Sequence, residues 1–260
     1  MMSASDFEIV SAAATHVGNV RKHNEDSYLS RPEIGLWVVA DGMGGHQAGD
    51  VASQAIVHSL EQMDDPVDGV QFIREVRQRL AEVNEQLMAE AATRGNGAVI
   101  GSTVVALLAF GSYFACVWAG DSRLYRLRDG TFLQMNRDHS QVQEMVDAGL
   151  LEPELAESHP LGNVITRAVG VHENLELDKV TDQLIPGDVF LLCSDGLSKT
   201  ADGPDIARIL AETELAEAPQ RLVDAALQAG GNDNVTVIAI QIGVPKGEAS
   251  NQSNLDMIGP

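Results

Sequence analysis

Four aspartates share one local pattern in this 260-residue chain. Each lies beside a strongly apolar segment, and each is next to glycine or in a glycine-rich turn. They are Asp41 in VVADGMGG, Asp121 in VWAGDSR, Asp195 in LLCSDGL and Asp233 in GGNDNV. A carboxylate has no packing role at the end of a buried strand, and burying it unpaired is costly. A bound cation is the simplest compensation, and glycine lets a ligand approach the backbone closely.

The adjacent acidic residues Glu25 and Asp26 could join the same set. A single Asp-Gly turn has an ordinary explanation, as at Asp129-Gly130, where hairpin chemistry between two short strands suffices. Several oxygen ligands together select Mg²⁺ or Mn²⁺, because zinc prefers His and Cys. Five or six carboxylates carry enough charge for two such cations, which in hydrolytic sites activate a water and stabilise an oxyanion.

Two other ligand-binding patterns fit less well. Gly44 and Gly49 have the separation of a phosphate-binding P-loop, but Asp50-Val51 stands where Lys-Ser/Thr is required. Calcium held for structure is an alternative use of acidic residues, but the sequence has no EF-hand spacing.

Apolar runs predict the strands that must position the aspartates. If these strands lie side by side, their ends meet and the carboxylates converge. The relevant segments are Leu36–Ala40, stopping at Asp41-Gly42, then Gly101–Phe110, Tyr113–Gly120, Val189–Cys193 and Val235–Ile242. Helical periodicity begins at Gln47 and recurs over Ile73–Leu87.

A different pattern covers the middle of the chain. Ser140 and Gln143 form a capping box, which predicts a helix that runs to Gly149. The segment Leu150–Gly170 is irregular, and we expect a mobile insert over the site. Helices are also predicted over Pro204–Glu214 and Pro219–Ala229, each with proline near its first turn.

Composition limits the possible partners and compartment. The net charge of −21 repels nucleic acid and anionic lipid, because phosphates bind Lys and Arg, so we expect neither as a partner. Cys116 and Cys193 lie in apolar runs, as buried reduced thiols of a cytosolic protein do. The N-terminus has no signal-peptide pattern, and the apolar runs are too short to span a bilayer. We expect a cytoplasmic protein.

Motifs spread over nearly the whole chain resemble those of the metal-dependent protein phosphatases of the PP2C (PPM) family, bacterial branch. Together they are specific, although each alone is weak. They are RKHNED (Arg21–Asp26), VVADGMGGH (Val38–His46), GSTVV (Gly101–Val105), AGDSRLY (Ala119–Tyr125), DHS (Asp138–Ser140), HPLGNVITRAVG (159–170), CSDGL (Cys193–Leu197) and GNDNVTVI (Gly231–Ile238).

This resemblance implies an α+β fold, a four-layer αββα sandwich of two packed antiparallel sheets flanked by helices. The phosphatase domain would cover residues 1–243 and carry a flap at about 138–170. Residues 244–260 are expected to form a disordered tail.

The resemblance also implies roles for individual residues. Two Mn²⁺ or Mg²⁺ ions would bind, with a weaker third ion at Asp121. Arg21 would bind the substrate phosphate, and Glu25 and Asn234 would support the ligands. The metal ligands would be Asp26, Asp41, the Gly42 carbonyl, Asp121, Asp195 and Asp233.

Two positions depart from the family pattern. Animal members have histidine where this chain has Met43, and that histidine is thought to protonate the leaving oxygen. Either a metal-bound water or His46 would then be the acid. Lys199 stands where some members place another acidic ligand of the third ion.

The implied function is hydrolysis of phosphoserine and phosphothreonine in proteins, by direct attack of a metal-bridging hydroxide. We expect a monomer that reverses the action of a bacterial Ser/Thr kinase. A metal-binding interaction module without turnover is the competing hypothesis, and the intact acidic set with Arg21 argues against it. A two-metal nuclease is disfavoured by the net charge of −21.

Overall fold

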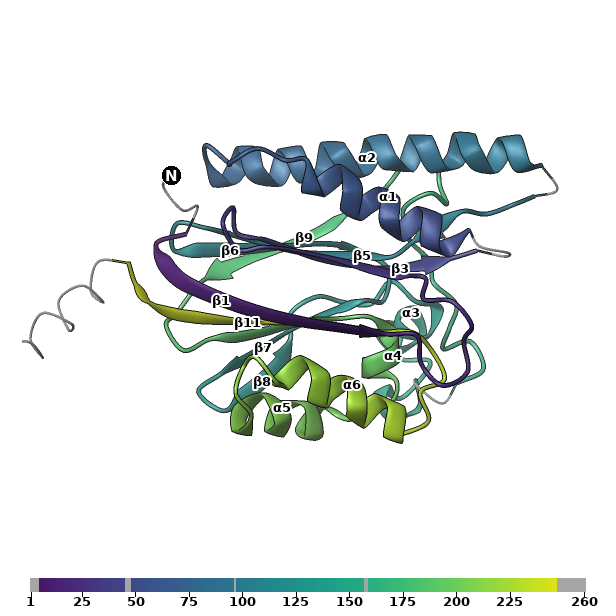
Figure 1. Ribbon diagram of the computed structural model, residues 1–260. Coiled ribbons are helices and arrows are strands. Elements are labelled where there is room, and N and C mark those ends of the chain that lie inside the picture. The colour runs from purple at the N-terminus through teal and green to yellow at the C-terminus, as the bar shows by residue number, and fades with distance from the viewer. Residues whose placement is uncertain (1–4, 45–47, 96, 157–158, 247–260) are drawn as a thin grey trace, which may run out of the picture.

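The computed structural model describes residues 5–44, 48–95, 97–156 and 159–246. Two antiparallel sheets pack face to face, and helices cover the outer face of each sheet (Figure 1). The arrangement confirms the expected α+β sandwich with helices outside and two sheets inside.

Each sheet is built from strands far apart in the sequence. In the five-stranded sheet the order is β1 (Phe7–His16), β11 (Val235–Pro245), β10 (Val189–Cys193), β7 (Arg123–Arg128) and β8 (Thr131–Gln134). In the six-stranded sheet it is β2 (Asp26–Arg31), β3 (Leu36–Met43), β5 (Val104–Phe110), β6 (Tyr113–Ala119) and β9 (Asp178–Gln183), with β4 (Gly101–Ser102) paired to β3.

Helices form the two outer layers. The six-stranded sheet is covered by α1 (Gly49–Glu61) and α2 (Gly69–Arg94), and the five-stranded sheet by α5 (Gly203–Glu212) and α6 (Ala218–Gln228) (Figure 1). The shorter helices are α3 (Gln141–Asp147), a 3-10 turn at Pro153–Leu155, and α4 (Asp195–Ser198). No helix among the described residues is long and apolar enough to cross a membrane.

Strand β3 shows why its sequence is continuously apolar. Val38 and Ala40 pack with α1 and α2, whereas Trp37 and Val39 point into the layer between the sheets. Alternate residues of a strand face opposite sides, so a strand covered on both sides needs apolar residues at every position. The same layers bury β5, β6, β10 and β11 and fix where these strands end.

The structure corrects the strand boundaries near the first aspartate. β3 does not stop at Asp41-Gly42 but continues to Met43, because β4 pairs with Gly42 and Met43. The expected strand Gly101–Phe110 is therefore divided at Thr103 into β4 and β5. β2 was not predicted, because its sequence, DSYLSR, has only two apolar residues.

The capping box and the end of the domain are clear in the structure. The Ser140 hydroxyl accepts a hydrogen bond from the Gln143 amide at 3.3 Å, and α3 follows it. β11 extends to Pro245, and the Lys246 amide bonds the Asp6 carbonyl at 2.7 Å. The tail was expected to begin at residue 244, but Val244 and Pro245 belong to β11, because this strand pairs with β1 as far as Pro245. Residues 247–260 of the expected tail lie outside the described residues.

Candidate active site

Five aspartates from both sheets meet at one end of the sandwich. Asp26 and Asp41 are direct register partners on β2 and β3 of the six-stranded sheet. Asp195 begins α4 after β10, and Asp233 precedes β11, so both lie beside strands of the five-stranded sheet. Asp121 lies in the turn where the chain passes from β6 of one sheet to β7 of the other. Figure 1 shows α4 at this end, near the end of β3.

The charges of the five aspartates influence one another, as the pKa of Asp41 indicates. Burial raises the pKa of Asp41 well above its ordinary value, and the charges of Asp26, Asp195, Asp121 and Asp233 raise it further. Like charges in one site disfavour ionisation of each group. The sequence predicts that acidic residues distant along the chain converge. The structure is consistent with this prediction for all five aspartates.

Asp26 and Asp121 are the most deeply buried members. Burial raises the pKa of Asp26 to about 7, although hydrogen bonds from Thr236 and Ser194 oppose the shift. Burial also raises the pKa of Asp121 to about 6, with the Asp195 charge adding to it. Perturbed acids of this kind gather where a protein binds or transforms a ligand.

The oxygens of this cluster fit a divalent cation. Among the described residues, four buried side-chain N or O atoms lack a hydrogen-bond partner, and two of them are Asp26 Oδ1 and Asp121 Oδ1. Buried polar atoms are rarely left unpaired, so each such atom needs an explanation. An all-oxygen donor set suits Mg²⁺ or Mn²⁺.

The backbone around Gly42 leaves no room for a side chain. A Cβ at this position would lie 2.0 Å from the Gly49 carbonyl oxygen and 2.6 Å from that of Glu25. The Gly42 amide donates to the same Glu25 carbonyl at 3.1 Å. Glycine is therefore required where β3, α1 and the segment before β2 meet.

The carboxylates lie near one another without forming a compact metal-binding group. Within the described part of the chain, no three Asp, Glu, His or Cys side chains form a finished metal-binding group. Like charges repel in a partly buried site, and a cation is needed to draw them together. The structure supplies two side-chain cations at the edges, Arg21 and Lys199.

Arg21 lies at the rim and Lys199 lies deeper. Arg21 Nη2 donates to Asp233 Oδ2 at 2.7 Å, and the arginine side chain is 53% exposed. Lys199 Nζ is 2.5 Å from Asp195 Oδ2 and 3.4 Å from Asp121 Oδ2. Burial alone would lower the pKa of Lys199, but these two carboxylates outweigh it and raise the pKa.

Asn234 and Glu25 hold the charged segment before β2 in place. Asn234 Oδ1 accepts from the Glu25 amide at 2.8 Å, and its Nδ2 donates to the carbonyls of Val17 and His23 at 2.9 and 3.0 Å. One side chain thus ties the start of β11 to the segment that carries Arg21. Burial and the Asp50 charge raise the pKa of Glu25.

Ser194 is a site residue that sequence reasoning missed. Its hydroxyl donates to Asp26 Oδ2 at 2.8 Å and accepts from the Thr236 amide at 3.0 Å, so it joins the two sheets. The only sequence signal was a hydroxyl residue directly after the apolar run of β10, and the structure buries it completely. Ser102 and Thr103 were also missed; they bind the carbonyl and the amide of Asp41 at 3.0 and 3.1 Å.

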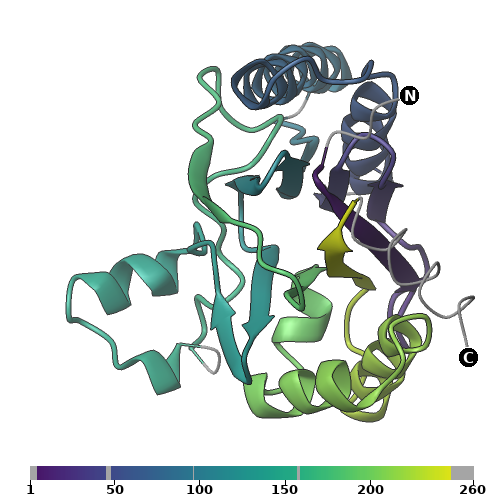
Figure 2. The same cartoon turned by 90° about the vertical axis from the view of Figure 1, so that its left-hand side faces the viewer.

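The segment that follows β8 extends away from the two sheets, with α3 at its outer part (Figure 2). Its base is anchored by Asp138, which accepts hydrogen bonds from Arg123 Nε at 3.0 Å and Nη2 at 2.7 Å. Its other described part reaches the aspartates, because Asn163 Oδ1 accepts from Lys199 Nζ at 2.8 Å. His46, the predicted alternative acid, lies outside the described residues.

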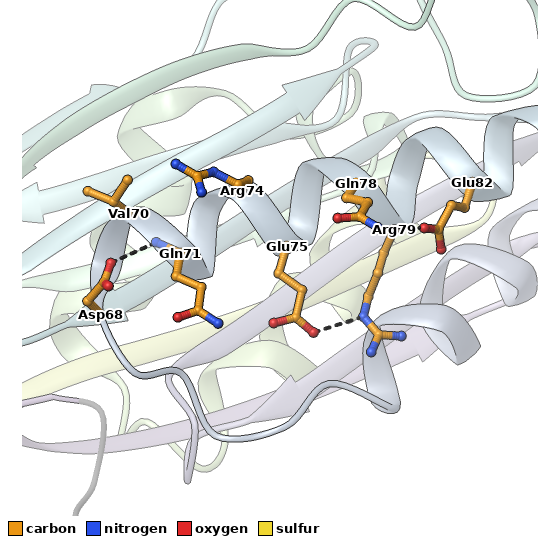
Figure 3. A pocket seen from close by; sticks show the side chains of 8 residues that line it. All are labelled: Asp68, Val70, Gln71, Arg74, Glu75, Gln78, Arg79 and Glu82. Carbon is orange, nitrogen blue, oxygen red and sulfur yellow. Dashed lines mark hydrogen bonds and ion pairs between the residues drawn. The ribbon is translucent and has the colours of Figure 1, made fainter.

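A separate cavity lies elsewhere on the molecule. A cavity of about 610 Å³ follows one face of α2, and its eight lining residues include none of the aspartates above (Figure 3). Several of its polar groups have local partners: Asp68 caps α2 through the Gln71 amide, and Glu75 pairs with Arg79. The cavity is a groove along a charged helix and does not indicate chemistry.

Comparison with known proteins identifies relatives over most of the chain. A family model described as Protein phosphatase 2C matches residues 16–229. The Serine/threonine protein phosphatase PstP of Mycobacterium tuberculosis is 38% identical over 231 residues, which are 89% of this chain and 44% of that protein. The chain therefore spans less than half the length of this curated relative.

Solved structures of related proteins have the same fold as this chain. PppA of Pseudomonas aeruginosa, described as a key regulatory component of T6SS, has a TM-score of 0.84 and 46% identity, covering 90% of this chain and 97% of that one. The catalytic domain of PstP in complex with two manganese ions has a TM-score of 0.82 and 36% identity, covering 91% of this chain and 99% of that one.

Proposed function

This chain belongs to the protein phosphatase 2C family, and we propose that it is a metal-dependent phosphatase that removes phosphate from phosphoserine and phosphothreonine in proteins. The observation that carries the proposal is the convergence of Asp26, Asp41, Asp195 and Asp233 from two sheets. The unpartnered buried oxygen of Asp26 supports a cation between them.

We assign the aspartates and the Gly42 carbonyl to two divalent cations, Mn²⁺ or Mg²⁺. Asp41 would serve both ions, and the Gly42 carbonyl would be a further ligand. Asp195 and Asp233 would complete one site, and Asp26 would serve the other. When bound, the cations supply an activated water and neutralise charge that develops on the phosphate oxygens. Ser194 keeps Asp26 oriented, since its hydroxyl occupies Oδ2 and leaves Oδ1 for the ion.

Arg21 is the residue we assign to the substrate phosphate. Its guanidinium is half exposed at the rim, and Asp233 engages its Nη2. The guanidinium has further N–H groups, so it can pair with a phosphate in a forked geometry while Asp233 holds it in place. Arg21 would thereby orient the phosphorus toward the aspartates.

Hydrolysis breaks the bond between phosphorus and the serine or threonine oxygen, and that oxygen must take up a proton. Met43 carries no proton to give. We propose either a water or His46 as the donor. The products are the free protein hydroxyl and inorganic phosphate.

Phosphorylated proteins made by a Ser/Thr kinase are the proposed substrates, and the proposed form is a cytoplasmic monomer. The net charge of −21 favours substrates whose phosphosites lie in basic or neutral segments, since an acidic partner would be repelled.

Release of phosphate from p-nitrophenyl phosphate and from phosphothreonine peptides in Mn²⁺ tests the proposal. Asp41→Ala should lower kcat/KM at least about 100-fold, because cation ligation supplies several kcal/mol of transition-state stabilisation. Asp224→Asn, an exposed change on α6, is the matched control and should keep full activity. Unchanged turnover in excess EDTA would refute the proposal, and tight Mn²⁺ binding without turnover would favour the interaction-module alternative.

A further inference from the structure

Lys199 brings together three segments of the chain. It follows the one-turn helix α4, four residues after Asp195, so the same turn presents a carboxylate and an ammonium to one space. Its Nζ contacts Asp195 Oδ2 at 2.5 Å, Asp121 Oδ2 at 3.4 Å and Asn163 Oδ1 at 2.8 Å. These oxygens come from α4, from the turn between β6 and β7, and from the segment beyond α3.

The geometry uses the whole hydrogen-bonding capacity of the lysine. An ammonium has three N–H donors and no acceptor, and here three oxygens lie around it. The lysine side chain is 28% exposed and Asp121 only 4%, so the pair is largely removed from water. Both contacts with the aspartates use Oδ2, and Oδ1 of Asp121 stays without a partner.

Asp121 depends on this lysine. Among the described residues, Lys199 is the cation that lies within ion-pair distance of Asp121. A carboxylate so deeply buried needs a compensating charge close by. The chain supplies that charge as a side chain, where an added divalent ion would otherwise be needed.

We propose that the Lys199 ammonium acts as a built-in cation that takes the place of a third divalent ion between Asp121 and Asp195 and ties the flap to the metal site through Asn163. The inference rests on the proposed function only in taking the aspartates as metal ligands. Lys199 is thus a positioning residue, and the position of Asn163 depends on the lysine and not on the concentration of free metal.

Two properties of the full chain test the proposal without turnover. The number of Mn²⁺ ions bound per chain is measured by equilibrium dialysis with metal analysis. Hydrogen exchange of backbone amides in residues 159–170 is measured in saturating Mn²⁺. The variants are Lys199→Asp, Lys199→Met, Lys199→Arg and Asn163→Ala, with Lys179→Met on the exposed edge of β9 as the matched control.

The wild type and Lys179→Met should bind two Mn²⁺ per chain, and Lys199→Asp should bind a third, because the aspartate both removes the ammonium and adds a ligand. The rate of amide exchange in the flap should rise about tenfold in Lys199→Met, because one charge-assisted hydrogen bond is lost. It should stay at the wild-type rate in Lys179→Met. Asn163→Ala should show the faster exchange with two ions still bound, and Lys199→Arg should restore slow exchange.

A wild type that binds three Mn²⁺ ions would overturn the proposal, and so would unchanged flap exchange in both Lys199→Met and Asn163→Ala. Asn163 is exposed, so its variant decides the question if Lys199→Met does not fold. The two proposals fail separately. If the chain binds two ions and flap exchange depends on Lys199, but no phosphate is released, the phosphatase function alone is refuted. If the wild type releases phosphate and binds three ions, the role of Lys199 alone is refuted.

Discussion

Replacing Asp26 with asparagine tests whether the aspartate cluster destabilises the folded protein when no divalent cation is bound. Asp26 is 8% exposed, and its Oδ1 has no hydrogen-bond partner in the described structure. Asparagine has the same shape, keeps an oxygen for the Ser194 hydroxyl and carries no charge. The substitution therefore removes the ionisation and leaves the packing in place.

The magnitude follows from the pKa of Asp26, which burial raises from 3.8 to about 7. Between these values the folded protein holds a proton that the unfolded chain has lost, so the free energy of unfolding falls as pH rises from about 4 to about 7. One pKa unit corresponds to about 1.4 kcal/mol, which gives an upper limit of about 4 kcal/mol. The wild type should lose this stability by neutral pH, and Asp26→Asn should keep it.

Urea denaturation in EDTA at about pH 4 and about pH 8 measures the difference. The two proteins should be nearly equal in stability at the lower pH, and Asp26→Asn should be more stable at the higher pH by up to about 4 kcal/mol. Asp224→Asn, an exposed carboxylate on α6, should follow the wild type throughout. A difference between Asp26→Asn and the wild type that is the same at both pH values would refute the reasoning, because it would not come from ionisation.

Two further results are expected. Millimolar Mn²⁺ should raise the melting temperature of the wild type, because a ligand of the native state at 100 times its Kd adds about 2.7 kcal/mol to the free energy of unfolding. A melting temperature insensitive to Mn²⁺ would contradict the clustering of the aspartates. Asp138→Asn should lower the free energy of unfolding in urea by about 3–5 kcal/mol, because it leaves the Arg123 guanidinium, which is only 18% exposed, without its charged partner. The control Arg208→Gln breaks the exposed pair with Asp205 and should lower it by at most about 1 kcal/mol.

The elements that position the site were largely predictable, because their signals are local. Continuous apolar runs indicated β5, β6, β10 and β11, and the Ser140 capping box indicated α3. The placement of Asp195 and Asp233 beside such runs followed directly. Hydrophobic periodicity works here because each of these segments is buried on one or both faces.

Other parts depend on contacts between distant segments, which a local pattern does not contain. β2 has few apolar residues, and it forms a strand because Asp26–Arg31 pairs along β3. β3 passes through Asp41 because β4 pairs beside Gly42 and Met43. The contact of Lys199 with Asp121 joins residues 78 positions apart, and only the family resemblance, not the residues around either one, connects the two positions.

The gathering of charge at one end of the sandwich opposes the stability of the fold, and the arrangement of the sheets explains how it persists. The pKa values of Asp26, Asp41 and Asp121 are raised, so each of these three groups costs free energy near neutral pH when it is ionised and unliganded. The opposing contribution comes from the apolar layers, which bury β3, β10 and β11 on both faces. Since the Ser194 hydroxyl joins Asp26 of one sheet to Thr236 of the other, separation of the sheets would break the site. The apolar interior thus holds in register carboxylates whose like charges repel one another.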